Sequence, residues 1–236
     1  MAGNRISAMR VLIGHEQFGR TREAFRRRGH DAWSCDLQPA RDGSPFHIVA
    51  DVETILGDGW NLAIFHPDCT YLTNSAEWAY KDPDFERYPD VGYHQKVKPG
   101  TLVGRERSEA RLAAVAHVIR LSRAPIQKIC IENPRGHLST AWRPPTQTIH
   151  PPQFGDDASK ATDLWLIRLE KLRPTGWAEP RMGGLPLFGG DGRPMRWANQ
   201  TDNGQNRLPP SDDRAMQRAA TFPGISEAMA EQWGAS

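Results

Sequence analysis

The sequence predicts an α/β fold with a mainly parallel sheet in a single domain. Over the first 135 residues, short apolar segments that end near glycine or acidic residues alternate with segments of helical pattern. Strands joined by helices form βαβ units, whose strands are parallel. The length of 236 residues, with 38% hydrophobic and 25% charged residues, suits one globular domain.

Five strands and two helices are expected in this first part of the chain. The strands are expected at residues 9–13, 31–35, 47–49, 61–65 and 127–131, and the helices at residues 21–28 and 106–122. In the second helix, apolar residues recur at the spacing of one helix face. They are Ala110, Ala113, Ala114, Val118 and Leu121.

The rest of the chain has a different character. Two more strands are expected at residues 146–149 and 162–167, and two more helices at residues 211–220 and 226–233. Residues 173–206 are rich in Gly, Pro and Arg and are expected to form a long loop. The single domain is therefore divided into a core at residues 1–172, a loop region at 173–208, and C-terminal helices at 209–236 that pack back on the core.

Composition and cysteine usage argue against several classes of protein. No segment approaches the roughly 18 apolar residues of a membrane span, and the first residues do not resemble a signal peptide. The net charge of +2 gives little support for nucleic-acid binding by itself, although arginines occur in clusters. The three cysteines, Cys35, Cys69 and Cys130, form no CxxC pair, which argues against disulfides and structural zinc. We expect a cytoplasmic protein with no membrane partner and no metal, in which one reduced thiol can act as a nucleophile.

Polar and reactive residues follow each of the first five expected strands. Each has a simple explanation by itself, as a turn, a helix N-cap or a buried thiol. Ligands of open α/β sheets bind at the carboxyl ends of the strands, so the complete set favours an active site. In chain order the set consists of the turn from Gly14 to Gly19, Asp36, Asp51, Pro67-Asp68-Cys69 and Glu132-Asn133-Pro134.

Two of these segments resemble the cytosine-C5 methyltransferases. Residues 64–69 are similar to the catalytic Pro-Cys loop of that family, and residues 131–134 to its Glu-Asn-Val segment. The similarity is closest to compact, phage-associated DNA cytosine methyltransferases and covers nearly the whole chain. It extends over residues 67–75, 147–166, 196–208 and 229–234. The resemblance implies a Rossmann-like methyltransferase fold that uses S-adenosylmethionine (SAM) and acts on DNA.

The resemblance also implies a role for each site residue. Cys69 is the nucleophile, Glu132 holds the cytosine edge and Asn133 fixes the loop geometry. Asp68, which the family pattern lacks, is counted with the catalytic residues because it adjoins the thiol. Asp36 accepts hydrogen bonds from the ribose hydroxyls of SAM, and Asp51 accepts one from the adenine amino group. The other cofactor-binding residues are Gly14, Glu16, Phe18, Gly19 and Pro67. The substrate-binding residues are Thr70, Tyr71, Asn74, Ser75, Pro134 and Gln153.

The chain departs from the family in three ways that affect function, and one is the turn from Gly14 to Gly19, which is thinner than the usual Phe-x-Gly-x-Gly. Asp68 separates Pro67 from Cys69, and its carboxylate either raises the pKa of the thiol or caps the following turn. The large target-recognition domain is missing, and residues 173–206 are the only candidate substitute, so little sequence specificity is expected.

Three functions remain open at this point. The first is SAM-dependent methylation of C5 of cytosine in DNA through a covalent adduct between Cys69 and C6. The second keeps the nucleophile but modifies RNA or installs another group, and the third is a catalytically degenerate protein that binds DNA or SAM. The target base must be single-stranded or flipped out of the duplex. Aromatic and basic residues after Cys69 are suited to stacking on bases, or they belong to an ordinary surface loop.

Overall fold

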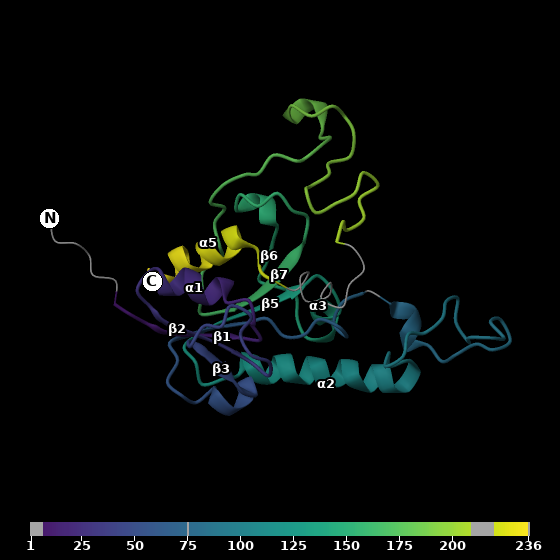
Figure 1. Cartoon of the computed structure of the whole chain (residues 1–236), viewed down its shortest axis with the longest axis horizontal. Helices are drawn as coiled ribbons and strands as arrows, with labels where there is room; N and C mark the ends of the chain where they lie inside the picture. Colours follow the sequence, from purple (N-terminus) through teal and green to yellow (C-terminus); the bar gives the residue numbers. More distant parts are fainter. Residues whose placement is uncertain (1–6, 75, 209–219, 236) are drawn as a thin grey trace.

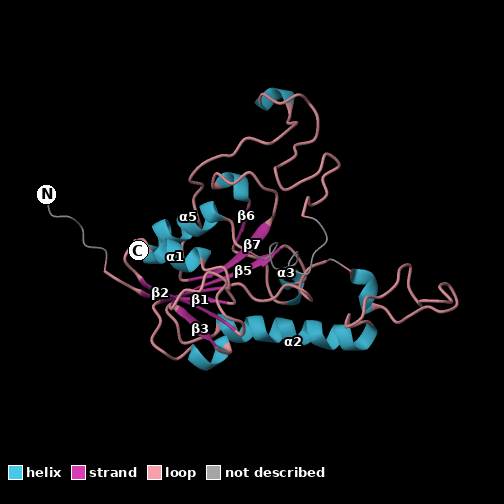
Figure 2. Cartoon of the chain, viewed as in Figure 1, coloured by secondary structure: helices cyan, strands magenta, loops and turns pink. Residues whose placement is uncertain are grey.

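The computed structural model describes residues 7–74, 76–208 and 220–235, and its central element is a seven-stranded sheet (Figure 1, Figure 2). The order of strands across the sheet is β3-β2-β1-β4-β5-β7-β6. Strand β7 runs antiparallel to both neighbours, and the other strand pairs are parallel. The strands are β1 (Arg10–Gly14), β2 (Asp31–Asp36), β3 (His47–Val49), β4 (Leu62–Phe65), β5 (Lys128–Pro134), β6 (Gln147–Ile149) and β7 (Thr162–Ile167).

Helices cover both faces of the sheet because its central strands are apolar on both sides. All four residues of β4 are buried, as expected for a strand inside a parallel sheet. Helices α1 (Arg20–Arg26) and α5 (Pro223–Gly234) pack on one face, where Phe25 and Trp233 are buried (Figure 1). Helix α2 (Gly104–Ser122) covers the other face through Val118 and Leu121.

The structure confirms the expected α/β class, the mainly parallel sheet and the helices on both faces. The seven expected strands are present, with one correction at their ends. Glu132, Asn133 and Pro134 belong to β5 instead of following it, because β7 pairs with them and extends the strand. The short helix α3 (Leu138–Ala141) was not expected from the sequence. The expected helix at residues 211–220 lies outside the described residues except for Ala220.

Two projections extend from this core in Figure 1. The first, residues 81–100, follows the 3-10 helix η2 (Glu77–Tyr80) and precedes α2. The second, residues 177–207, lies in the expected loop region and carries the 3-10 helix η4 (Pro186–Phe188). We call this second projection the arm.

Within residues 7–74, 76–208 and 220–235, no helix combines the length and the apolar character that a membrane crossing needs.

Candidate active site

The expected site residues converge where the strand order reverses, between β1 and β4. This position is the topological switch point, where ligands bind in open α/β sheets. Gly14 at the end of β1 is paired with Phe65 of β4, and the His66 amide donates to the Gly14 carbonyl at 3.0 Å. The carboxyl ends of β2, β3 and β5 lie along the same edge, since these strands are parallel to β1 and β4.

Cys69 lies in a tight turn after β4 and is half-buried. Its carbonyl accepts from the amides of Leu72 at 3.0 Å and Thr73 at 3.1 Å. Asp68 caps this turn, because its Oδ1 accepts from the Thr70 amide at 2.9 Å and from the Thr70 hydroxyl at 2.7 Å. The carboxylate that departs from the family pattern therefore has a structural role in the loop.

Helix α2 holds the segment that follows Cys69. The Tyr71 carbonyl accepts from Arg111 Nε at 2.9 Å and from the Tyr80 hydroxyl at 3.0 Å. The guanidinium of Arg111 also lies 3.4 Å from the centre of the Tyr80 ring, a cation–π contact. Tyr71, expected to bind substrate, is thus anchored by its backbone, and Tyr80 packs here instead of presenting a free ring.

The residues after β5 hold the same segment from the other side. The His137 amide donates to the Leu72 carbonyl at 2.7 Å. Gly136 lies against Leu72 and Thr73 so closely that a Cβ atom there would collide with their backbone. A glycine at position 136 is therefore required for this close approach.

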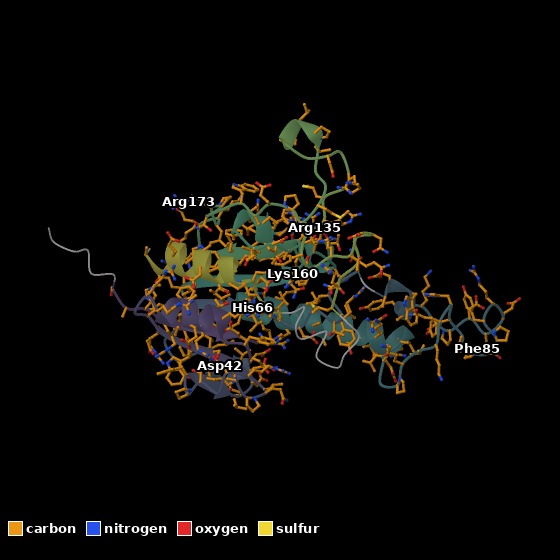
Figure 3. All side chains as sticks on the ribbon, turned by 45° about the horizontal axis from the view of Figure 1, so that its top comes forward. Asp42, His66, Phe85, Arg135, Lys160 and Arg173 are labelled. Carbon is orange, nitrogen blue, oxygen red and sulfur yellow. The ribbon has the colours of Figure 1, made fainter. Side chains whose placement is uncertain are left out.

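Glu132 is the buried acid of the site, with only 4% of its surface exposed. Its Oε2 lies 2.7 Å from His66 Nδ1, and its Oε1 lies 3.9 Å from Lys160 Nζ. Burial acts to raise the pKa of Glu132, but the charge of Lys160 and the hydrogen bond from His66 together lower it below the ordinary value. In Figure 3 the labels of His66 and Lys160 lie in the middle of the molecule, and Phe85 lies at the end of the first projection.

Burial and two carboxylates govern the pKa of the Cys69 thiol. Burial raises this pKa most, and the negative charge of Asp68 raises it further. Lys160 lowers the pKa and Glu132 raises it by a smaller amount. All three charges are therefore close enough to act on the thiol, and Lys160 is the cation among them.

Lys160 was not identified from the sequence. It lies in an irregular segment before β7, and nothing in its spacing relates it to Cys69 or Glu132. The antiparallel pairing of β7 with β5 brings the start of β7 beside the end of β5, because Thr162 pairs with Pro134. That pairing places Lys160 at the site.

Asn133 joins the segment that carries Glu132 to the segment that carries Cys69. It is 1% exposed, and its Nδ2 donates to the Pro67 carbonyl at 2.9 Å. This bond ties β5 to the loop that carries Cys69.

The expected cofactor residues lie at the ends of β1, β2 and β3. Asp36 Oδ1 accepts from Gln17 Nε2 at 3.0 Å and from the Gln38 amide at 2.9 Å. Asp51 Oδ1 accepts from the Glu53 amide at 3.0 Å and caps the 3-10 helix η1 (Val52–Ile55). The described hydrogen bonds use one carboxylate oxygen of each aspartate, so the second oxygen remains available to a ligand.

The turn after β1 is shaped by its own residues. Both oxygens of the buried Glu16 accept from the first amides of α1, those of Thr21 at 2.7 Å and Arg22 at 3.2 Å. Glu16 thus caps the helix. Gly19 has a φ of 67°, and the half-buried Phe18 ring lies 5.7 Å from the Arg20 guanidinium.

His15, in the same turn, belongs to a hydrogen-bond network of polar side chains that was not predicted from the sequence. His15 Nε2 lies 3.1 Å from His117 Nε2, and His117 Nδ1 lies 2.6 Å from Glu53. His15 has a φ of 61°, a conformation that stores strain in a residue other than glycine. Burial and the neighbouring His117 lower the pKa of His15 from 6.5 to about 4, so its imidazole is neutral at pH 7.

The remaining residues that were expected to bind substrate lie at different places in the structure. Asn74 is exposed beyond the Cys69 turn, and Pro134 is the last residue of β5. Gln153 ends the 3-10 helix η3 (Pro151–Gln153), where its side chain accepts from the His150 amide at 2.8 Å. Ser75 lies outside the described residues.

Replacing Asp68 by asparagine should make Cys69 more reactive. The amide oxygen still caps the turn, but the negative charge that raises the pKa of the thiol is gone. Below its pKa a thiol is alkylated in proportion to its thiolate fraction, so the rate at pH 7.5 should rise by up to about tenfold for a shift of up to one unit. The measurement is iodoacetamide labelling of the Cys69 peptide, followed by mass spectrometry.

Asp58→Asn is the matched control for this substitution. Asp58 is exposed at the opposite edge of the sheet, where its carbonyl accepts from Arg10 at the start of β1. Labelling of Cys69 that is equally fast in wild type and Asp68→Asn would show that the carboxylate does not act on the thiol.

No protein-family model matches the sequence, and a search of curated proteins found no match either. The geometry of the site and its two short segments are therefore the basis for assigning a function.

Proposed function

We propose that this chain belongs to the cytosine-C5 methyltransferases and transfers a methyl group from SAM to C5 of cytosine in DNA. The observation that carries the proposal is the convergence of Cys69, Glu132 and Lys160 at one edge of the sheet, within electrostatic reach of one another. The strand order, with β7 reversed between β5 and β6, is compatible with the methyltransferase fold that the resemblance implies and supports the proposal.

The strand ends fit the nucleoside part of SAM. Asp36 and Asp51 each offer a carboxylate oxygen at the ends of adjacent strands, and such acids accept from ribose hydroxyl and amino groups. When bound there, SAM supplies the methyl group on a positively charged sulfur. In this arrangement the Pro67–Cys69 segment, after β4, lies on the far side of β1 from Asp36 and Asp51.

Cys69 supplies the covalent step. Its thiolate adds to C6 of cytosine, and the electron pair of the C5–C6 double bond moves toward C5, N3 and O2 of the ring. C5 then attacks the methyl group, with S-adenosylhomocysteine as the leaving group. A base removes the C5 proton, the double bond re-forms and the thiolate is expelled, which returns Cys69 to its starting state.

Glu132 orients the base, and Lys160 stabilises the charge that this addition creates. Glu132 is ionised in the free protein, since its pKa is lowered, and can accept a hydrogen bond from the cytosine amino group. Its Oε2 lies 2.7 Å from His66 Nδ1, and this contact orients the carboxylate. Lys160 adds a positive charge beside Glu132, where negative charge develops in the ring.

The test is methyl transfer from labelled SAM to nucleic acid of defined type. The purified chain is incubated with duplex DNA, single-stranded DNA and RNA of matched sequence, and the nucleosides are analysed by mass spectrometry. We expect 5-methylcytosine in DNA, in many sequence contexts because the large recognition domain is missing. Label in RNA, or a product other than 5-methylcytosine, would favour the second function. DNA binding without any transfer would favour the degenerate protein.

A further inference from the structure

The arm ends in large apolar side chains that are exposed to solvent. Leu187 is 93% exposed, Phe188 is 83% exposed and Leu185 is 59% exposed. All three lie in or beside the short 3-10 helix η4, at the end of the projection seen in Figure 1. Exposed apolar side chains that are grouped in this way mark a surface that another molecule covers.

The backbone of the arm holds this tip away from the core. Met182 and Arg196 form a bridge across its base, and the Gly184 amide donates to the Arg193 carbonyl at 2.7 Å. Gly190 lies so close to Gly184 that a Cβ atom on it would collide with the backbone. The tip is thus presented by a hydrogen-bonded hairpin whose glycines allow the two sides to come together.

The arm carries a small positive charge. Residues 177–207 contain four arginines, two aspartates and one glutamate, which gives a net charge of +1. Arg193 has 65% of its side chain exposed and lies beside Asp191, its ion-pair partner. Arg181, on the other side of the tip, is 29% exposed and pairs with Asp202. Both guanidinium groups are thus partly exposed beside an aspartate, and guanidinium groups bind the phosphates of a nucleic-acid backbone.

The base of the arm is attached to the segment that carries Lys160. Asn199 Oδ1 accepts from the Ser159 amide at 2.8 Å, and Asn199 Nδ2 donates to the Ser159 carbonyl at 3.0 Å. The Ala198 amide donates to Asp157 at 2.9 Å. These bonds lie one to three residues before Lys160, whose ammonium is 3.9 Å from Glu132. The arm therefore starts beside the proposed active site.

We propose that the arm binds a DNA duplex and inserts Leu187 and Phe188 between stacked base pairs beside the target cytosine. This inference rests on the proposed function, which requires the cytosine to leave the stack. Apolar wedges of this kind unstack base steps and stabilise the opened duplex, and arginines hold the adjacent phosphates. A stable protein interface buries about 800 Å² on each partner, which is far more than three side chains at the end of a narrow hairpin provide.

The experiment uses the full chain with Leu187 and Phe188 both replaced by alanine. Its probe is a fluorescent DNA duplex with 2-aminopurine next to a single cytosine, and the same cytosine strand without its complement serves as the second probe. We expect duplex affinity to fall at least tenfold and the rise in 2-aminopurine fluorescence to disappear. Affinity for the single strand should change less than twofold, because a single strand needs no wedge.

Leu112→Ala is the matched control. Leu112 is 69% exposed on α2, the helix that covers one face of the sheet, and its replacement should leave both affinities unchanged. Arg193→Gln should weaken duplex binding and reduce its dependence on salt.

Three results would overturn the inference. The first is an unchanged affinity of the double variant for the duplex, and the second is an equal loss of affinity for the duplex and for the single strand. The third is that the wild type binds anionic vesicles, or self-associates, and that the double variant has lost this binding. None of these readouts needs methyl transfer. A tip-dependent duplex affinity in a protein that transfers no methyl group would keep the inference and remove the proposed catalytic function.

Discussion

Replacing Cys69 by serine is expected to abolish methyl transfer and the covalent adduct with DNA that contains 5-fluorocytosine. With fluorine at C5 no proton can be removed, so the adduct between Cys69 and C6 persists after methylation and is seen as a shifted band on a denaturing gel. A serine hydroxyl is a far weaker nucleophile at neutral pH than a thiolate. The rate should fall by roughly four orders of magnitude or more, as for the loss of other enzyme nucleophiles.

The control for this experiment is Cys35→Ala, which removes a different thiol. Cys35 is buried in β2 and its Sγ donates to the Ala50 carbonyl at 3.4 Å, so it cannot reach a DNA base. The control variant should form the adduct as the wild type does. An adduct that forms in Cys69→Ser would contradict the assigned chemistry. So would a wild-type adduct that forms without SAM and whose amount does not change when SAM is added.

The sequence was sufficient to predict the sheet and the loop that carries Cys69. Each strand of the core is a short apolar segment with a clear end, and the parallel arrangement follows from the helices between the strands. The same arrangement predicts that Gly14, Asp36 and Cys69 share one edge. These predictions need only local patterns and one rule about parallel sheets.

The sequence was insufficient where contacts depend on long-range pairing. Lys160 reaches Glu132 only because β7 runs antiparallel to β5, and that reversal leaves no local pattern in the sequence. His66 is the hydrogen-bond partner of Glu132, and no spacing in the sequence relates these two residues. Among the described residues, no group of three or more His, Cys, Asp or Glu side chains is arranged to hold a metal ion.

The arrangement around Cys69 explains why Lys160 matters for the chemistry. Burial, Asp68 and Glu132 all raise the pKa of the thiol, which stays above its ordinary value despite Lys160, so the thiolate is scarce at neutral pH in the free protein. Lys160 lowers the pKa of the thiol and also the pKa of Glu132. One ammonium group therefore favours the ionised form of both the Cys69 thiol and the Glu132 carboxyl group.

Replacing Lys160 by methionine should lower kcat by about 10²- to 10³-fold, roughly 3–4 kcal/mol, which is the usual effect of removing one group that stabilises developing charge. It should also raise the pKa of Cys69, because the cation that lowers it is gone. The thiolate then forms at higher pH, so the curve of Cys69 alkylation rate against pH should move to higher pH. Methyl-transfer kinetics and iodoacetamide labelling between pH 6 and pH 10 measure the two effects separately.

Lys160→Arg and Lys171→Met serve as the comparisons. Arginine keeps the positive charge and should restore most of the shift in the alkylation curve, whereas Lys171 is exposed outside the site and its loss should change neither measurement. A purely structural role for Lys160 would lower the melting temperature without moving the alkylation curve of the folded protein. Lys160→Met with an unchanged curve would therefore remove Lys160 from the electrostatics of the site, and full methyl transfer by the same variant would remove it from catalysis.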